Sequence, residues 1–229
     1  MLPVHEKLGK NNNDNGNLGF IHRFIPADHS RKNDEVKSHV LLLLHGTGGN
    51  EEDLIPIGKM ISPESAILSP RGKVLENGMP RFFRRLAEGV FDVEDLKYRT
   101  CELATFVSNA SQVYGFDLNR TIAVGFSNGA NIGASMLLLR PEVLSGAILF
   151  RAMVPLELES LPDLSEKHIV LSEGLYDPIV TQQEAKKLFL LLEKSRAKIS
   201  LRWQKSSHNL TQDDILVAKE WFRSTFSFT

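Results

Sequence analysis

Apolar residues follow two alternating patterns along most of the chain. Short apolar runs bounded by glycine or polar residues are typical of buried strands, whereas apolar residues that recur every three or four positions are typical of helices. The predicted strands are 39–44, 66–69, 121–126, 146–150, 168–172 and 199–204, and the predicted helices are 51–60, 93–114, 128–140, 181–196 and 211–224. Because strands alternate with helices, the sequence predicts an α/β fold with a doubly wound, mostly parallel sheet and helices on both faces.

The N-terminal part, residues 1–38, departs from this alternation. It holds two short strand-like runs, 4–8 and 20–26, separated by the asparagine-rich stretch 10–17, which we interpret as a mobile hairpin loop. Further on, residues 71–89 form a long segment with no clear period, which we expect to be irregular. A chain of 229 residues fits one domain with a full core, so we expect a single domain over 1–229.

Composition excludes several classes of partner. The net charge is -1, which gives no electrostatic reason to expect nucleic acid or an anionic membrane as a partner. No apolar run is long enough to cross a bilayer, and the only cysteine, Cys101, cannot form an internal disulfide. We therefore expect a cytoplasmic protein in which Cys101 is a small buried residue of a helix. The histidines are scattered without metal-ligand spacing, so no metal and no cofactor are expected.

The stretch 121–134, TIAVGFSNGANIGA, combines a predicted buried strand, a turn and a predicted helix of small residues. The turn holds Gly125, Ser127 and Gly129 in a G-x-S-x-G pattern, which is typical of a nucleophile on a sharp strand-to-helix turn. The glycines leave room where the strand and the helix nearly touch. We interpret Ser127 as a nucleophile; the alternative is an ordinary turn serine.

A serine nucleophile needs a base within hydrogen-bond distance and a third group that orients the base. On a sheet of this kind the expected chain order is serine, acid, histidine. Asp177 follows the predicted strand 168–172, and His208 follows the predicted strand 199–204. All three residues therefore come at the carboxyl ends of parallel strands, where such sheets bind their ligands.

Other residues compete for these two roles. Glu173 adjoins its strand and is expected to point elsewhere, whereas Asp163 precedes a strand and so lies at the opposite edge. Asp177 itself fits a turn residue before Pro178. His45 ends a central strand, but we interpret it as structural, with its ring bound to nearby backbone.

Ester hydrolysis also needs backbone N–H groups directed at the developing oxyanion. The residue after the nucleophile, Asn128, supplies one of these groups. The glycine-rich loop HGTGG, residues 45–49, lets its backbone turn inward, so we assign the second group to Thr47. A phosphate-binding loop is the alternative, but the segment lacks the Walker lysine and the G-x-G-x-x-G spacing.

Together, the segments LLLLHGTGGNEEDL, SPRG, GFSNGANIG, LSEGLYDPIV and SHNL make the chain resemble the α/β-hydrolase superfamily over residues 40–222. Within it the chain resembles the phospholipase/carboxylesterase family, near the acyl-protein thioesterases and dienelactone-hydrolase-like esterases. The resemblance implies Ser127, Asp177 and His208 as the catalytic triad and the amides of Thr47 and Asn128 as the oxyanion hole. Ser207 stands where many relatives have glycine before the histidine.

Only residues 151–167 separate the predicted strands 146–150 and 168–172, too few for a large helical lid domain. We therefore expect an open site for small or short-chain esters. Four large apolar side chains are candidates for the pocket wall, and ordinary core is the alternative: Met79, Phe82, Phe83 and Met153. Five arginines are expected to be solvated or paired with acids at the surface, and the alternative is that they bind a carboxylate or phosphate of the substrate: Arg71, Arg81, Arg84, Arg85 and Arg151.

The sequence thus predicts a serine carboxylesterase that acts on a small-molecule ester. Two other functions stay open. The first alternative is an acyl-protein thioesterase, lysophospholipase or serine peptidase that uses the same site. The second is a non-catalytic binding protein on the same fold, which needs none of the three triad residues. We also expect that the protein can form a homodimer.

Overall fold

Seven strands form the central sheet of the computed structural model, which describes residues 18–28 and 38–226. The expected strand 4–8 and the asparagine-rich loop 10–17 lie outside the described residues. In sheet order the strands are β1 (His22–Ile25), β3 (Ala66–Pro70), β2 (Val40–Leu44), β8 (Thr121–Phe126), β9 (Gly146–Phe150), β10 (His168–Gly174) and β11 (Lys198–Gln204). Strand β1 pairs antiparallel with β3, and the other pairings are parallel.

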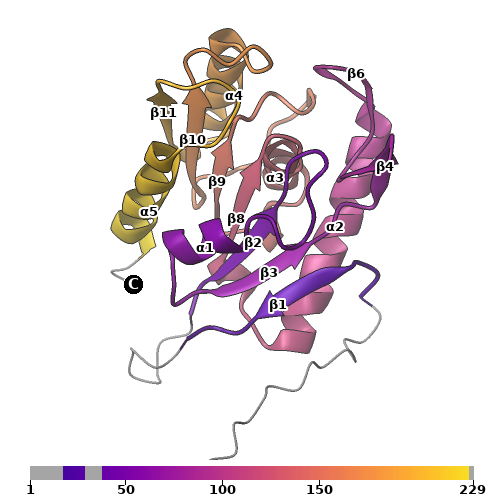
Figure 1. Ribbon diagram of the computed structural model, residues 1–229, viewed down its shortest axis with the longest axis vertical. Helices are drawn as coiled ribbons and strands as arrows, with labels where there is room; N and C mark the ends of the chain where they lie inside the picture. The colour runs from indigo at the N-terminus through magenta and orange to yellow at the C-terminus, as the bar shows by residue number, and fades with distance from the viewer. Residues whose placement is uncertain (1–17, 29–37, 227–229) are drawn as a thin grey trace, which may run out of the picture.

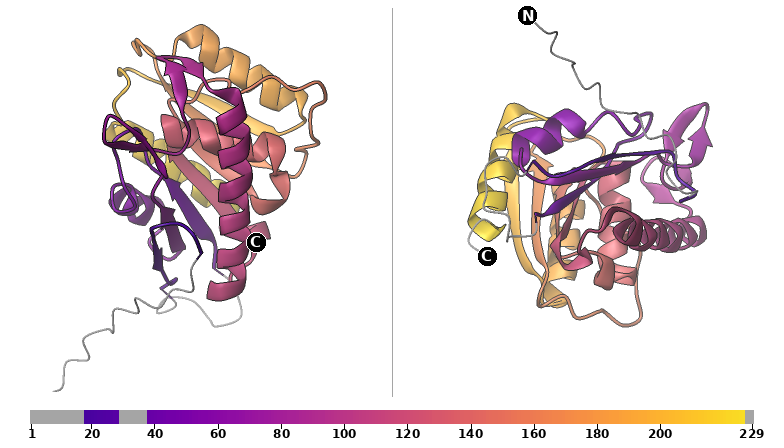
Figure 2. Two further views of the ribbon diagram at one scale, coloured as in Figure 1. Left: turned by 90° about the vertical axis from the view of Figure 1, so that its right-hand side faces the viewer. Right: turned by 90° about the horizontal axis from the view of Figure 1, so that it is seen from below.

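Helices cover both faces of this sheet, as the alternating pattern predicts (Figures 1 and 2). The helices α2 (Val93–Tyr114), α3 (Asn128–Leu139) and α4 (Gln182–Lys194) pack on one face. The helices α1 (Ile55–Ile61) and α5 (Gln212–Phe226) pack on the other face and contact each other. Two short 3₁₀ turns, η2 (Leu118–Arg120) and η3 (Pro141–Val143), flank β8 and α3 in the chain. The fold is therefore a doubly wound α/β sheet.

The apolar positions of the central strands explain why both faces need cover. All five residues of β2 are buried, with Leu42 and Leu44 in the core on the α2–α3–α4 side and Leu41 and Leu43 in the core on the α1–α5 side. Successive side chains of a strand point to opposite faces, so a fully apolar strand requires a layer on each side. Because both faces of the sheet are covered, polar functional groups are expected at the ends of the strands.

Two expectations about helices are wrong. The first helix starts at Ile55 rather than at residue 51, because Pro56 has no N–H and fits only the first turn of a helix. Residues 51–54 form turns instead. Cys101 is exposed, not buried, because it lies on α2 away from the face that buries Leu96 and Leu103.

The segment 71–89, expected to be irregular, belongs to two small hairpins, the second of which extends to Phe91. The first pairs β4 (Val74–Glu76) with β5 (Met79–Arg81), and the second pairs β6 (Arg85–Ala87) with β7 (Val90–Phe91). Asn77 and Gly78 join β4 to β5 with φ of 52° and 79°. Positive φ at both central residues is typical of the tight turn that Asn-Gly forms between paired strands. Both hairpins carry residues to the edge of the sheet where β2, β8, β10 and β11 end.

Residues 151–167 connect β9 to β10 without a helix or strand, so no large lid domain is inserted there. Among the described helices, none has the length and apolar character needed to cross a membrane.

Candidate active site

Ser127 occupies the turn between β8 and α3. Its backbone has φ 52° and ψ −113°, a conformation that is strained for a residue with a side chain. Two hydrogen bonds hold it there: the Ser127 amide donates to the Phe150 carbonyl at 2.9 Å, and the Asn131 amide donates to the Ser127 carbonyl at 2.9 Å. The strain is thus held by the end of β9 on one side and by the first turn of α3 on the other.

The glycines of the same turn are required by close packing. A Cβ at Gly125 would lie 2.6 Å from the Gly129 carbonyl oxygen, and a Cβ at Gly129 would collide with the Leu44 carbonyl. The neighbouring atoms are backbone, which cannot move aside cheaply. Because neither glycine has a side chain, the start of α3 can pack directly against the ends of β2 and β8.

The structure brings Ser127, His208 and Asp177 together in one hydrogen-bonded chain. His208 Nε2 lies 2.9 Å from Ser127 Oγ, and His208 Nδ1 lies 2.8 Å from Asp177 Oδ2. The Asp177 side chain is fully buried, and its Oδ1 accepts hydrogen bonds from the amides of Ile179 and Val180. Asp177 is thereby fixed, and it orients the imidazole so that Nε2 faces the serine hydroxyl.

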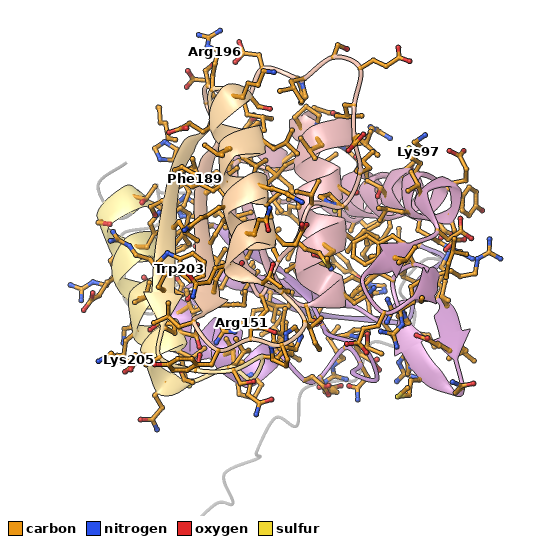
Figure 3. The ribbon with its side chains drawn as sticks, turned by 90° about the horizontal axis from the view of Figure 1, so that it is seen from above. Lys97, Arg151, Phe189, Arg196, Trp203 and Lys205 are labelled. Carbon is orange, nitrogen blue, oxygen red and sulfur yellow. The ribbon has the colours of Figure 1, made fainter. Side chains whose placement is uncertain are left out.

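The loop that carries His208 is held from beneath by Arg151. This arginine is fully buried, with φ 57°, and its guanidinium donates to the carbonyls of Ser207 and Asn209 at 3.1 and 2.8 Å. It also pairs with Asp214 at the start of α5. Figure 3 shows Arg151 inside the outline of the molecule, whereas Lys97 and Arg196 lie at its periphery. The expectation of a solvated or surface-paired arginine is wrong for Arg151, and for Arg81, which is 3 % exposed.

The competing acids and the competing histidine lie elsewhere. Glu173 is fully buried and accepts a hydrogen bond from the Ala152 amide, and burial raises the pKa of its carboxyl well above the usual value. Asp163 pairs with Arg196 on the surface. His45 binds backbone as expected: Nδ1 lies 2.7 Å from the Gly46 carbonyl, and Nε2 accepts the Gly72 amide at 2.9 Å. Its bonds to backbone give it a structural role.

Thr47 and Asn128, the predicted oxyanion-hole residues, both line the cavity that contains Ser127 and His208. The loop of Thr47 is tied to the first hairpin, because the Gly48 amide donates to the Pro80 carbonyl and Arg81 donates to Thr47 Oγ1. Asn128 is the first residue of α3, and the first amides of a helix have no partner within the helix. Its side-chain oxygen accepts the Phe82 amide at 2.7 Å, which links α3 to the same hairpin segment.

The cavity has a volume of about 320 Å³. It is lined by Thr47, Arg81, Arg85, Glu88, Gly89, Phe91, Phe126, Ser127, Asn128, Asn131, Arg151, Met153, Ile179, Val180 and His208. One side of the wall comes from the β4–β5 and β6–β7 hairpins, most of which lie in the segment 71–89 that was expected to be irregular. Ile179 and Val180 follow Asp177 directly, so their place next to the predicted acid was a usable signal.

Of the four side chains predicted for the pocket wall, Met153 lines the cavity. Phe82 and Phe83 do not; they are core residues, 2 % and 0 % exposed, with Phe82 packed on the His45 ring and Phe83 on Phe91. Met79 lies partly exposed on β5, beside Gly48. The aromatic wall residues are instead Phe91 and Phe126, which lie at the end of β7 and at the end of β8.

No cluster of three or more potential metal ligands occurs within residues 18–28 and 38–226.

A doubly wound sheet with a serine on the β8–α3 turn and a histidine after the last strand defines the class of α/β-hydrolases. The family model described as phospholipase/carboxylesterase matches residues 30–225, and the chain belongs to this family. It is a hydrolase.

Individual relatives agree with this assignment. The chain is 50% identical to MhqD of Bacillus subtilis (strain 168) over 188 residues, which cover 82% of this chain and 94% of that protein. The crystal structure of a Bacillus cereus carboxylesterase is similar, with a TM-score of 0.86 and 45% identity over 92% of this chain and 96% of that chain. A structure of YahD with malic acid has a TM-score of 0.82 and 33% identity over 90% of this chain and 99% of that chain.

Proposed function

We propose that this protein is a serine carboxylesterase that hydrolyses small or short-chain carboxylic esters through an acyl-enzyme on Ser127. The observation that carries the proposal is the continuous chain of contacts from Ser127 Oγ through His208 to Asp177, at 2.9 and 2.8 Å. An ordinary turn serine has no need of a buried carboxylate that orients a histidine toward it.

The proposed reaction has two halves. As Ser127 Oγ attacks the ester carbonyl carbon, His208 Nε2 takes the hydroxyl proton, and the bond to the alcohol oxygen then breaks with that proton passing to the leaving alcohol. In the second half, His208 takes a proton from water as the water oxygen attacks the acyl carbon. The bond to Oγ breaks, Ser127 regains its proton, and the carboxylic acid leaves. Asp177 stays ionised and stabilises the charged imidazolium in both halves.

The amides of Thr47 and Asn128 are proposed to hold the oxyanion. Each donor of this kind contributes roughly 3 kcal/mol to lowering the barrier in enzymes where it has been removed. Their support by the hairpin segment, through Pro80, Arg81 and Phe82, keeps both amides in place before the oxyanion forms. Preorganised donors need no rearrangement during the reaction.

The preference for short acyl groups rests on the size of the cavity. A volume of about 320 Å³ lies at the small end of ligand pockets, and the connection 151–167 adds no helix that could cover a long chain. A long acyl chain would remain largely in water and gain little from burial. We expect p-nitrophenyl acetate and butyrate to be hydrolysed faster than the dodecanoate.

The test is the Ser127→Ala variant, assayed with p-nitrophenyl butyrate and labelled with a fluorophosphonate probe. Hydrolysis and labelling should both disappear. Ser135→Ala is the matched control, because Ser135 is a fully buried serine on α3, the helix that follows Ser127, and does not line the cavity. Full turnover by Ser127→Ala would rule out the proposal, and a faster reaction with an S-acyl peptide or a lysophospholipid than with any small ester would replace the proposed substrate class.

Two further expectations stay predictions. The neutral charge balance and the single cysteine support a cytoplasmic location. A homodimer would be detected by sedimentation of the full-length chain.

A further inference from the structure

Two arginines from the hairpins face the same cavity as Ser127. Arg81 ends β5 and Arg85 begins β6, and both line the cavity wall. Arg81 is 3 % exposed, and the Arg85 side chain is 29 % exposed. A buried guanidinium is costly unless its donors are satisfied, so the partners of these two residues decide what they do.

The guanidinium of Arg81 is only partly satisfied by the protein. Its Nε donates to the Phe83 carbonyl at 3.1 Å, and its Nη1 donates to Thr47 Oγ1 at 2.6 Å. Glu76 Oε2 lies 3.2 Å from Nη1, close enough for an ion pair but without hydrogen-bond geometry. Nη2 donates to no residue in the described part of the chain, and this atom is not fully buried. The two N–H groups of Nη2 thus have no acceptor among the described residues, in an arginine that lines the cavity.

Arg151 lines the same cavity, but all of its donors are bound by other residues of the protein. Its Nε, Nη1 and Nη2 donate to three backbone carbonyls, to Ser206 Oγ and to both oxygens of Asp214. No donor of Arg151 is left for a ligand. Arg81 differs from it in this respect.

The charges around the two hairpin arginines do not cancel within the hairpins. One carboxylate serves both, because Glu76 Oε1 accepts from Arg85 Nε at 2.9 Å while Oε2 approaches Arg81. Burial lowers the pKa of Arg81, and the positive charge of Arg85 lowers it further, whereas Glu76 raises it. A guanidinium nevertheless stays ionised at neutral pH. Among the residues that line the cavity the acid is Glu88, and it is exposed to solvent.

We propose that the substrate of this site is an ester that also carries a free carboxylate, which Nη2 of Arg81 and the outer nitrogens of Arg85 bind. This inference rests on the proposed esterase function and names its substrate class. The guanidinium fork matches a carboxylate in geometry, and a carboxylate supplies the acceptors that the two arginines lack. Because Arg81 also donates to Thr47, a bound carboxylate connects substrate recognition to the loop that carries the proposed oxyanion donor.

The experiment compares matched pairs of neutral and anionic esters. Phenyl butyrate is compared with phenyl hydrogen succinate, which places the carboxylate on the acyl side. Phenyl acetate is compared with para-acetoxybenzoate, which places it on the alcohol side. For the wild-type protein we expect kcat/KM to be higher for the anionic member of at least one pair, and succinate to inhibit hydrolysis competitively.

The decisive measurement is the anionic-to-neutral ratio of kcat/KM within each variant. Arg81→Met and Arg81→Lys lower activity on all esters, because they also remove the bond to Thr47. We expect the ratio itself to fall about tenfold or more, as for loss of a hydrogen-bonded charge, mostly through KM. Lysine should restore only part of it, since an ammonium lacks the planar fork. Arg85→Met should lower the ratio less.

Arg84→Met is the matched control, because Arg84 lies between the two in sequence, is 62 % exposed and does not line the cavity. Its ratio should equal that of the wild type. A ratio that Arg81→Met leaves unchanged, with no inhibition by succinate, overturns the carboxylate site while leaving the esterase intact. Absence of turnover on every ester by the wild type would instead overturn the proposed function itself. Comparing ratios within one variant cancels any loss of folded protein.

Discussion

Arg151 and Asp214 form a buried, two-pronged ion pair, with Nη1 2.8 Å from Oδ1 and Nη2 2.8 Å from Oδ2. Neither side chain is exposed. The pair joins three parts of the chain: Arg151 follows β9, Asp214 lies in the first turn of α5, and the carbonyls on either side of His208 accept from the same guanidinium. The position of the proposed base therefore depends on a contact beneath it, outside the triad.

Replacing Arg151 with methionine should destabilise the protein strongly and also reduce kcat. Asp214 would be left buried with an uncompensated charge, which typically costs about 3–5 kcal/mol. The loop of His208 would lose its two carbonyl contacts. Urea unfolding and kcat measured on the same preparations test this.

Two comparisons make that prediction specific. Arg140→Met removes an exposed ion pair with Glu142 and should cost less than about 1 kcal/mol, without a change in kcat. Asp214→Asn should behave like Arg151→Met, and the double variant should cost much less than the sum of the two, since both break one network. Additive effects would contradict the coupling.

The capping pattern of the last helix illustrates how far sequence reasoning reached. The predicted helix 211–224 is present as α5, and Thr211 and Asp214 cap its start: the Thr211 amide donates to Asp214 Oδ2, and the Asp214 amide donates to Thr211 Oγ1. That Asp214 also binds Arg151, across 63 residues, leaves no local trace in the sequence. Local periods and caps predict elements, whereas such long-range pairings depend on the assembled sheet.

The cavity wall shows the same limit. The residues at strand ends, Ser127, Asp177 and His208, could be located because a parallel sheet places strand ends on one edge. The hairpins of residues 71–92 were missed, although Asn77-Gly78 is a strong hairpin signal. Their strands are only two or three residues long, too short to show a period. The position of the first hairpin over the site is fixed by long-range contacts with the loop 45–49.

Gly129→Ala should be far more damaging than Gly115→Ala. At Gly129 the new Cβ collides with the Leu44 carbonyl, so α3 must separate from β2 and move Ser127 with it. At Gly115, the C-cap of α2, the Cβ would meet open space, and the cost is that of φ 71° for alanine, about 1–2 kcal/mol. Thermal unfolding and esterase activity of the two variants test the difference. Equal losses of activity would contradict the crowding argument.

His45 should make stability depend on pH below neutrality. Burial lowers its pKa below the usual 6.5, so the unfolded chain binds the proton more readily than the folded protein does. Stability therefore falls as pH decreases from about 6.5 toward the lower folded pKa, and is retained above 6.5. The structure supplies the reason: Nδ1 lies against the Gly46 carbonyl and Nε2 accepts from Gly72, so a second ring proton has no acceptor.

Urea unfolding of the wild type and His45→Gln between pH 5 and 8 tests this. The variant should be less stable at pH 8 and should lose less stability than the wild type on acidification. His168, whose pKa burial also lowers, provides His168→Gln as a comparison at the opposite end of the sheet. Parallel pH profiles for wild type and His45→Gln would exclude His45 as the source.

Glu173 should contribute a pH dependence of the opposite sign. Burial raises the pKa of its carboxyl well above the usual 4.5, so the folded protein keeps a proton that the unfolded chain releases. Its contribution to stability is then fully present below pH 4.5 and is lost as pH rises toward the folded pKa. One oxygen accepts the Ala152 amide, while Oε2 has no partner among the described residues.

Glutamine is neutral at every pH and can keep the bond to Ala152, so Glu173→Gln should gain stability relative to the wild type as pH rises from 5 to 9. Glu220→Gln, an exposed site on α5, is the control. The difference between Glu173→Gln and wild type in urea unfolding, followed across that range, measures the effect; a difference that stays constant with pH would mean that Glu173 is ionised in the folded protein.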